Sequence, residues 1–126
     1  MISTVFFIEG NVPSKKNQRQ TFYKNGRIIN IPSKRYLEWH DQAMNQLQAL
    51  KIPEFKPPYK ITLSFWFKDN RPKDMDNAAQ SILDLLQDYG VIENDKWQCI
   101  QELHLYSHGI DKNLPRVKVD ISSEIE

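Results

Sequence analysis

The chain switches between two hydrophobic periodicities, and the switches divide it into strands and helices. Residues 2–9 (ISTVFFIE) are rich in β-branched and aromatic residues, which favours a strand. Residues 60–68 (KITLSFWFK) carry an apolar side chain at every second position, the pattern of a strand with one buried face. Shorter strand-like segments at 98–106 and 116–121 complete the set of predicted single strands.

Two longer segments follow the 3.6-residue period of a helix. The first runs from about Lys34 to Leu50 and is preceded by Ser33, whose hydroxyl is suited to cap its first turn. The second follows residues 71–77 and stops at Gly90, a residue that favours the left-handed end of a helix. The apolar positions that predict the buried faces are Tyr36, Leu37, Ala43, Met44, Leu47 and Leu50 in the first helix, and Ala78, Ala79, Ile82, Leu83, Leu86 and Tyr89 in the second.

Two strand-prone runs flank the dipeptide Asn25-Gly26, which favours the positive φ angles of a type I′ turn. A hairpin is therefore predicted, with Lys24 and Arg27 at its tip. The order strand, hairpin, helix, strand, helix, strand, strand indicates an α+β fold. We expect a mixed or antiparallel sheet carrying two main helices, together with this basic β-hairpin. The loop between the last two strands has an ordinary length, which is compatible with antiparallel pairing between them.

The length of 126 residues predicts a single domain over 1–126. With 40% hydrophobic and 26% charged residues, the chain is unlike a disordered protein, and no apolar run is long enough for a membrane span. The N-terminus lacks the features of a secretory signal. The single cysteine, Cys99, excludes an intrachain disulfide and a cysteine-rich zinc site. The reducing cytoplasm is the expected location.

Charge is distributed unevenly, although the net charge is only +1. Residues 1–40 carry seven Lys or Arg against two Glu, whereas the rest of the chain carries ten basic and fourteen acidic residues. This asymmetry suggests a polyanion-facing segment beside an acidic cluster. The alternative is that the basic segment is simply a solvated loop.

The stretch RPKDMDN at residues 71–77 places two aspartates one residue apart, directly before the second helix. Side chains two residues apart project from the same side of an extended segment, and Pro72 biases the preceding residue toward that conformation. Asp74 and Asp76 are therefore expected to converge. The positive end of the helix dipole favours anions at this position.

Asn77 and Gln80 match a capping-box pattern, so Asp76 is not needed as the helix cap. Free carboxylates suit a hard cation such as Mg²⁺, and Asp95 is the best candidate for a third ligand. Such a site requires the chain to return from the end of the second helix toward its start. The alternative is that Asp74 and Asp76 only begin a helix and that Asp95 is a turn residue.

Three motifs together resemble the RusA family of Holliday-junction resolvases. They are G-N-V-P-S-K-K-N at 10–17, D-M-D-N at 74–77, and G-V-I-E-N-D at 90–95, with the second aspartate nineteen positions before Asp95. The resemblance extends over roughly residues 4–121 and includes the basic hairpin.

The resemblance implies metal-dependent hydrolysis by Asp74, Asp76 and Asp95, which would be both the catalytic residues and the ligands of Mg²⁺, with Mn²⁺ as an alternative. Family members are small α+β homodimers that cut four-way DNA junctions in recombination and repair, and many are encoded by phages or prophages. Two symmetric nicks in such branched DNA need two active sites related by a two-fold axis. The residues predicted to contact DNA are Lys15, Lys16, Arg19, Lys24, Arg27, Arg71 and Lys73.

One position departs from the family pattern. The family usually has a lysine four residues after the second aspartate, where this chain has Gln80. A neutral amide is a poorer partner for charge that develops on a phosphate. Lys73, Lys96 or Lys15 could supply the cation instead. Two other functions remain open: a non-catalytic DNA-junction-binding module, and a phage structural or adaptor protein.

Overall fold

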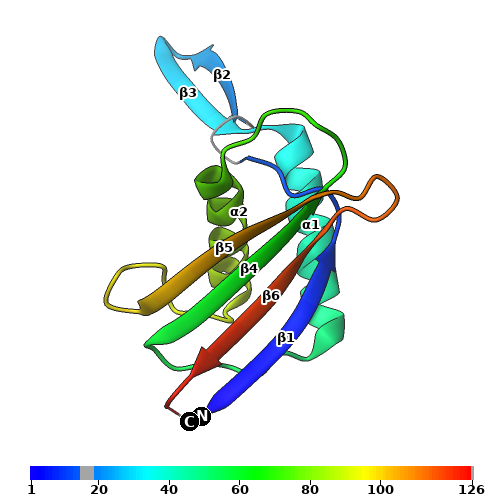
Figure 1. Cartoon of the computed structure of the whole chain (residues 1–126). Coiled ribbons are helices and arrows are strands. Elements are labelled where there is room, and N and C mark those ends of the chain that lie inside the picture. Colours follow the sequence, from blue (N-terminus) through cyan, green and yellow to red (C-terminus); the bar gives the residue numbers. More distant parts are fainter. Residues whose placement is uncertain (15–18, 126) are drawn as a thin grey trace.

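A computed structural model of the chain describes residues 1–14 and 19–125 (Figure 1). Its elements follow the predicted order, and the α+β class is confirmed. The elements are β1 (Ile2–Glu9), β2 (Arg19–Lys24), β3 (Arg27–Pro32), α1 (Lys34–Leu50), β4 (Tyr59–Phe67), α2 (Met75–Tyr89), β5 (Ile100–Ile110) and β6 (Arg116–Ser123).

The main sheet has four strands in the order β1-β6-β4-β5. Strand β6 runs antiparallel to both β1 and β4, whereas β5 runs parallel to β4. A parallel pair needs a crossover connection, which α2 supplies between β4 and β5. The last two strands, β5 and β6, do not pair, because β4 lies between them. The length of the loop between β5 and β6 is compatible with antiparallel pairing of these two strands, but it did not indicate that β6 pairs with β1 and β4 instead.

Both helices cover one face of the sheet, and the core lies between the two layers (Figure 1). Strand β4 is central, and side chains on its helix-facing side are almost completely buried, as are alternate residues of β6. The largest fully buried side chains include Tyr59, Ile61, Leu63 and Phe65 of β4, Ile8 of β1, Ile121 of β6, Leu47 of α1, and Ile82, Leu85 and Leu86 of α2.

Helix α1 has the predicted bounds, but its buried face differs from the predicted face. Leu37 and Leu50 are 47% and 45% exposed. The buried stripe contains Trp39 and Ala43, which continue the helical period from Tyr36 and end at Leu47. Leu37 lies beside this stripe, and Leu50 lies at the last residue of the helix, so neither reaches the sheet.

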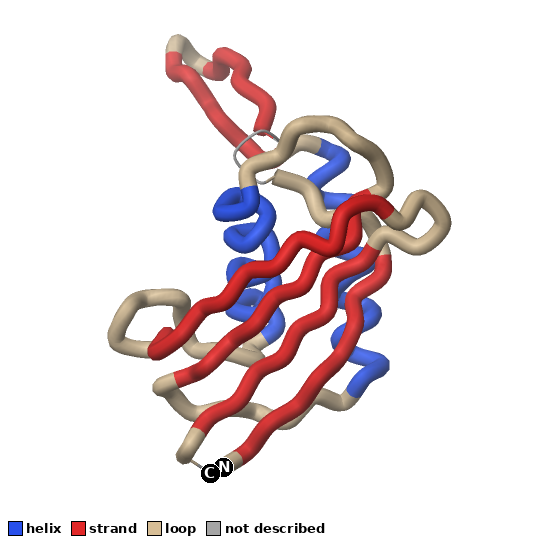
Figure 2. The backbone as a smooth tube through the Cα atoms, viewed as in Figure 1, coloured by secondary structure: helices blue, strands red, loops and turns tan. Residues whose placement is uncertain are grey.

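The strands β2 and β3 form the predicted hairpin, which projects beyond the end of the main sheet (Figure 2). Lys24 pairs with Arg27 across a two-residue turn. Asn25 and Gly26 have φ angles of 52° and 76°, the positive values that a type I′ turn requires. The prediction of a tight turn from the dipeptide alone is confirmed.

Gly90 ends α2 in the left-handed conformation, with φ of 95°. Its N–H donates to the carbonyl oxygens of Leu86 and Gln87, each at 3.1 Å. We expect Gly90→Ala to lower the free energy of unfolding by about 1–2 kcal/mol, because a Cβ strains this conformation. Gly90→Asn should cost less, since asparagine tolerates it better. Urea unfolding measures the free energy of unfolding of both variants. Equal stability of Gly90→Ala and wild type would contradict the left-handed conformation of Gly90.

Candidate active site

The two aspartates of the DMDN motif lie on either side of the start of α2. Asp74 is the N-cap residue, with extended backbone angles (φ −73°, ψ 131°), and Asp76 lies in the first helical turn. The prediction that both aspartates occupy an extended segment is therefore wrong. Both side chains are exposed, while Met75 between them packs against the core. An acidic residue in the first turn is stabilised by the helix dipole.

The predicted capping box is also wrong, because the helix begins at Met75 and Asn77 is already inside it. The side chain of Asn77 donates instead to Asp74, with Nδ2 3.2 Å from Oδ2. The backbone N–H of Asn77 donates to Oδ1 of Asp76 at 2.8 Å. Asn77 thus links the two carboxylates from within the helix, and Gln80 is available for other partners.

Gln80 connects α2 to the segment that carries Asp95. Its Nε2 donates to Oδ2 of Asp95 at 3.0 Å and to Oδ1 of Asp84 at 2.9 Å. The chain therefore returns after Gly90 and places Asp95 beside the helix, one turn beyond Asp76. This return was the unproved requirement for a shared site.

Asp84 belongs to the same acidic surface, although the sequence predictions did not include it among the site residues. Residues four apart share one face of a helix, so Asp76, Gln80 and Asp84 lie in a row. The regular spacing of these three polar positions is the signal that could have identified Asp84. The surface presents carboxylates from α2 and from the loop after it, with one neutral amide between Asp84 and Asp95.

The chemistry of these residues suits a hard cation, since their carboxylate oxygens are the ligands that Mg²⁺ prefers. In the conformation described, residues 1–14 and 19–125 contain no group of three His, Cys, Asp or Glu side chains that could hold a metal ion. Oδ2 of Asp95 accepts a hydrogen bond from Gln80, so metal ligation by this oxygen competes with that bond. Ligation by Asp74, Asp76 and Asp95 together remains a prediction.

Lys73 is half-buried just before the helix. Nζ donates to the carbonyl oxygen of Val12 at 2.6 Å and lies 5.0 Å from the centre of the Phe67 ring. Burial lowers the pKa of Lys73, an effect that the nearby Asp69 carboxylate partly offsets. Lys73 thus ties the loop before α2 to the segment after β1.

The other predicted DNA contacts have varied surroundings. Arg71 is exposed, and its Nε lies 3.7 Å from Oδ2 of Asp69. Arg27 is exposed at the hairpin turn. Arg19 and Lys24 are the end residues of β2, while Lys15 and Lys16 lie outside the described residues. Lys96, a candidate substitute for the family lysine, is exposed directly after Asp95.

In the described part of the chain, no helix combines the length and the apolar character needed to cross a membrane.

Comparison with models of known protein families gives a match. The family model described as Endodeoxyribonuclease RusA matches residues 11–122, a range that includes all three aspartates and both helices. No curated protein sequence matches the chain. Proteins of this family are nucleases that act on DNA and generally depend on a metal ion. Because the match extends over nearly the whole chain, the protein belongs to the RusA family of endodeoxyribonucleases.

Proposed function

We propose that the protein is a Mg²⁺-dependent, structure-selective endonuclease that resolves four-way DNA junctions by paired phosphodiester hydrolysis, with residues 1–126 forming one domain. The observation that carries the proposal is the position of Asp95, which the Gln80 hydrogen bond holds beside the helix that begins with Asp74 and Asp76. The proposed ligands come from two separate segments of the chain, and this contact supports the proposal that they act together.

Asp74, Asp76 and Asp95 are the proposed metal ligands and catalytic residues. When bound, Mg²⁺ (or Mn²⁺) would polarise the scissile phosphate and lower the pKa of a water molecule that attacks it. The exposed positions of Asp74 and Asp76 leave room for a phosphate to approach. Asn77 hydrogen-bonds to both carboxylates, which restricts their rotamers and is expected to orient them for ligation.

The hairpin and the basic residues near α2 are proposed to position the DNA through its phosphates. The hairpin extends away from the sheet, so a cation at its turn can reach a duplex arm far from the carboxylates (Figure 2). We expect Arg27→Gln to weaken junction binding about three- to tenfold and to reduce the salt dependence of log Kd by about one. Fluorescence anisotropy in EDTA at several salt concentrations tests this, and an unchanged slope would remove Arg27 from the interface.

We also propose that the active form is a homodimer. Two cuts placed symmetrically across a junction are most simply made by two sites related by a two-fold axis. The sheet face opposite the helices is available for association, because Val5 and Phe7 of β1 are 51% and 46% exposed there. Light scattering coupled to size exclusion measures the mass, and a monomer at working concentrations would contradict the dimer.

One gel separates the proposed function from its alternatives. Purified protein is incubated with a labelled four-way junction in Mg²⁺ or in EDTA, beside a linear duplex of equal length. Symmetric cleavage of the junction in Mg²⁺ alone supports the nuclease. Binding without cleavage under both conditions indicates a non-catalytic junction-binding module. An absence of binding at low salt, where phosphate contacts are strongest, indicates a structural or adaptor protein.

A further inference from the structure

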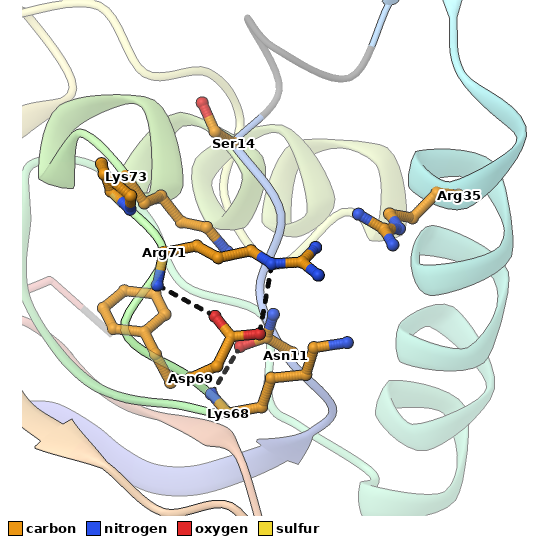
Figure 3. Close-up of a pocket in the computed structure, with 9 residues that line it drawn as sticks. Asn11, Ser14, Arg35, Lys68, Asp69, Arg71 and Lys73 are labelled. Atoms are coloured by element: carbon orange, nitrogen blue, oxygen red, sulfur yellow. Dashed lines mark hydrogen bonds and ion pairs between the residues drawn. The ribbon is translucent and has the colours of Figure 1, made fainter.

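A cavity of about 220 Å³ lies where the segment after β1, the start of α1 and the loop between β4 and α2 meet (Figure 3). An adjoining hollow of about 240 Å³ shares Asn11, Arg35, Lys68 and Lys73 with it. None of Asp74, Asp76 and Asp95 lines either space. The residues that line the cavity are Asn11, Ser14, Arg35, Phe67, Lys68, Asp69, Arg71, Pro72 and Lys73.

The lining is strongly cationic. Four basic residues line the cavity together with a single acidic residue, Asp69. This carboxylate is already engaged by Arg71, through its backbone N–H at 3.1 Å and its Nε at 3.7 Å. In Figure 3 the guanidinium groups of Arg35 and Arg71 extend toward each other across the cavity. Like charges arranged in this way repel, and an anion between them would relieve the repulsion.

A buried hydroxyl gives a second and independent indication of a ligand. Ser14 is only 2% exposed, and its Oγ has no hydrogen-bond partner among the residues that the structure describes. The indole Nε1 of Trp39, at the adjoining hollow, is likewise buried without a partner in the described part of the chain. Buried polar groups without a hydrogen-bond partner cost folding free energy and are uncommon, so a bound ligand is a natural partner for each of them. Both can donate, and a group rich in acceptor oxygens would satisfy them.

A neutral donor is also present at the cavity wall. The Oδ1 of Asn11 accepts from the backbone N–H of Lys68 at 3.0 Å. This bond fixes the orientation of the amide and leaves its NH₂ group as a donor. The cavity therefore combines guanidinium, ammonium, hydroxyl and amide donors, with few apolar groups apart from Phe67 and Pro72. This combination is typical of a phosphate site and unlike that of a pocket for an apolar ligand.

We propose that this cavity is a phosphate-binding site, contacted by Ser14, Arg35 and Lys68, that holds a backbone phosphate of bound DNA. Assignment to DNA rests on the proposed function, whereas affinity for a phosphate group does not. The site is separate from the carboxylates, and Lys73 joins the two regions through the loop that leads into α2. A phosphate held here fixes the DNA strand relative to the start of that helix.

The first test measures DNA binding without cleavage. In EDTA, Ser14→Ala and Arg35→Gln should each weaken binding of a fluorescent four-way junction about five- to tenfold. Arg35→Gln should also reduce the salt slope by about one, whereas Ser14→Ala should leave the slope unchanged because it removes no charge. The matched control is Lys56→Gln, which removes an exposed cation before the start of β4, at the opposite end of that strand, and should bind as wild type.

Ser14→Ala also gives a readout that a structural role would not produce. Because the hydroxyl lacks a partner within the described residues, its removal should leave the melting temperature unchanged or slightly raised. A marked fall in melting temperature would mean that Ser14 serves the fold, and would overturn its role in phosphate binding.

The second test uses inorganic phosphate alone. Sodium phosphate should raise the melting temperature of the wild type more than sodium chloride does at equal ionic strength. The excess should fall by at least about half in Ser14→Ala and Arg35→Gln but not in Lys56→Gln. Loss of both the phosphate effect and DNA affinity supports the proposal in full.

Other outcomes overturn the proposal in distinguishable ways. If the variants lose the phosphate effect but bind DNA as wild type does, the cavity takes a free anion and its assignment to DNA is wrong. If the wild type responds to phosphate but binds no DNA, the proposed function fails while the anion site stands. If neither readout changes in the variants, there is no phosphate site.

Discussion

Asp76→Asn is expected to abolish cleavage of a four-way junction in Mg²⁺ while leaving its binding in EDTA intact. Asparagine has nearly the same shape as aspartate and can still accept the hydrogen bond from the backbone N–H of Asn77, so the start of α2 should be preserved. The lost negative charge should weaken metal binding and reduce the cleavage rate by at least about 10²-fold.

Single-turnover cleavage of a labelled junction measures the rate, and anisotropy in EDTA measures binding. Asp41→Asn is the matched control, since it removes an exposed carboxylate from α1 and should cleave at the wild-type rate. Asp95→Asn should reproduce the loss if the loop after α2 shares the site. Normal turnover by Asp76→Asn would exclude this residue from the chemistry.

Gln80→Lys is expected to raise the cleavage rate about tenfold while leaving the fold intact. The amide nitrogen of Gln80 already lies 2.9 Å from Asp84 and 3.0 Å from Asp95, so an ammonium would lie between two carboxylates and form charge-assisted bonds. A cation at this position can also stabilise charge that develops on the phosphate. The cleavage rate at saturating Mg²⁺ tests the expected gain in activity, and the melting temperature tests whether the fold is intact.

Gln80→Met distinguishes the effect of an added positive charge from the effect of losing the hydrogen bond between Gln80 and Asp95. Methionine is similar in length but removes both hydrogen bonds, so it frees the carboxylate without adding a cation. We expect no gain in rate from this variant. An equal gain in Gln80→Met and Gln80→Lys would attribute the effect to release of Asp95. A slower Gln80→Lys enzyme would mean that another group, such as the exposed Lys96, already supplies the charge.

Short sequence patterns predicted those turns and helix ends that depend on the backbone preferences of one or two residues. The Asn25-Gly26 turn follows from backbone preferences of two residues, and the structure gives both the positive φ angles that it requires. The stop of α2 at Gly90 has the same kind of cause. The first turn of α2 was harder to predict, because Asp74 and Asn77 are both good cap residues and local preference did not distinguish between them.

Patterns were less informative where distant segments compete for the same surface. Leu37 and Trp39 are both apolar positions of α1, and packing against the sheet buries Trp39 and leaves Leu37 exposed. The partner of β6 was similarly undetermined. Loop length permits pairing with β5, but the pairing that forms places β6 between β1 and β4, where its alternating valines complete the core.

The sequence by itself determined the α+β class, the hairpin turn, the two helices and membership of the RusA family, since these depend on periodicity, turn residues and short motifs. Only the tertiary structure decided that Asp95 lies against Gln80 and that Ser14 is buried beside a cationic cavity. The physical reason is that these contacts join residues 15 or more positions apart, whose proximity depends on strand order and on how the helices cover the sheet.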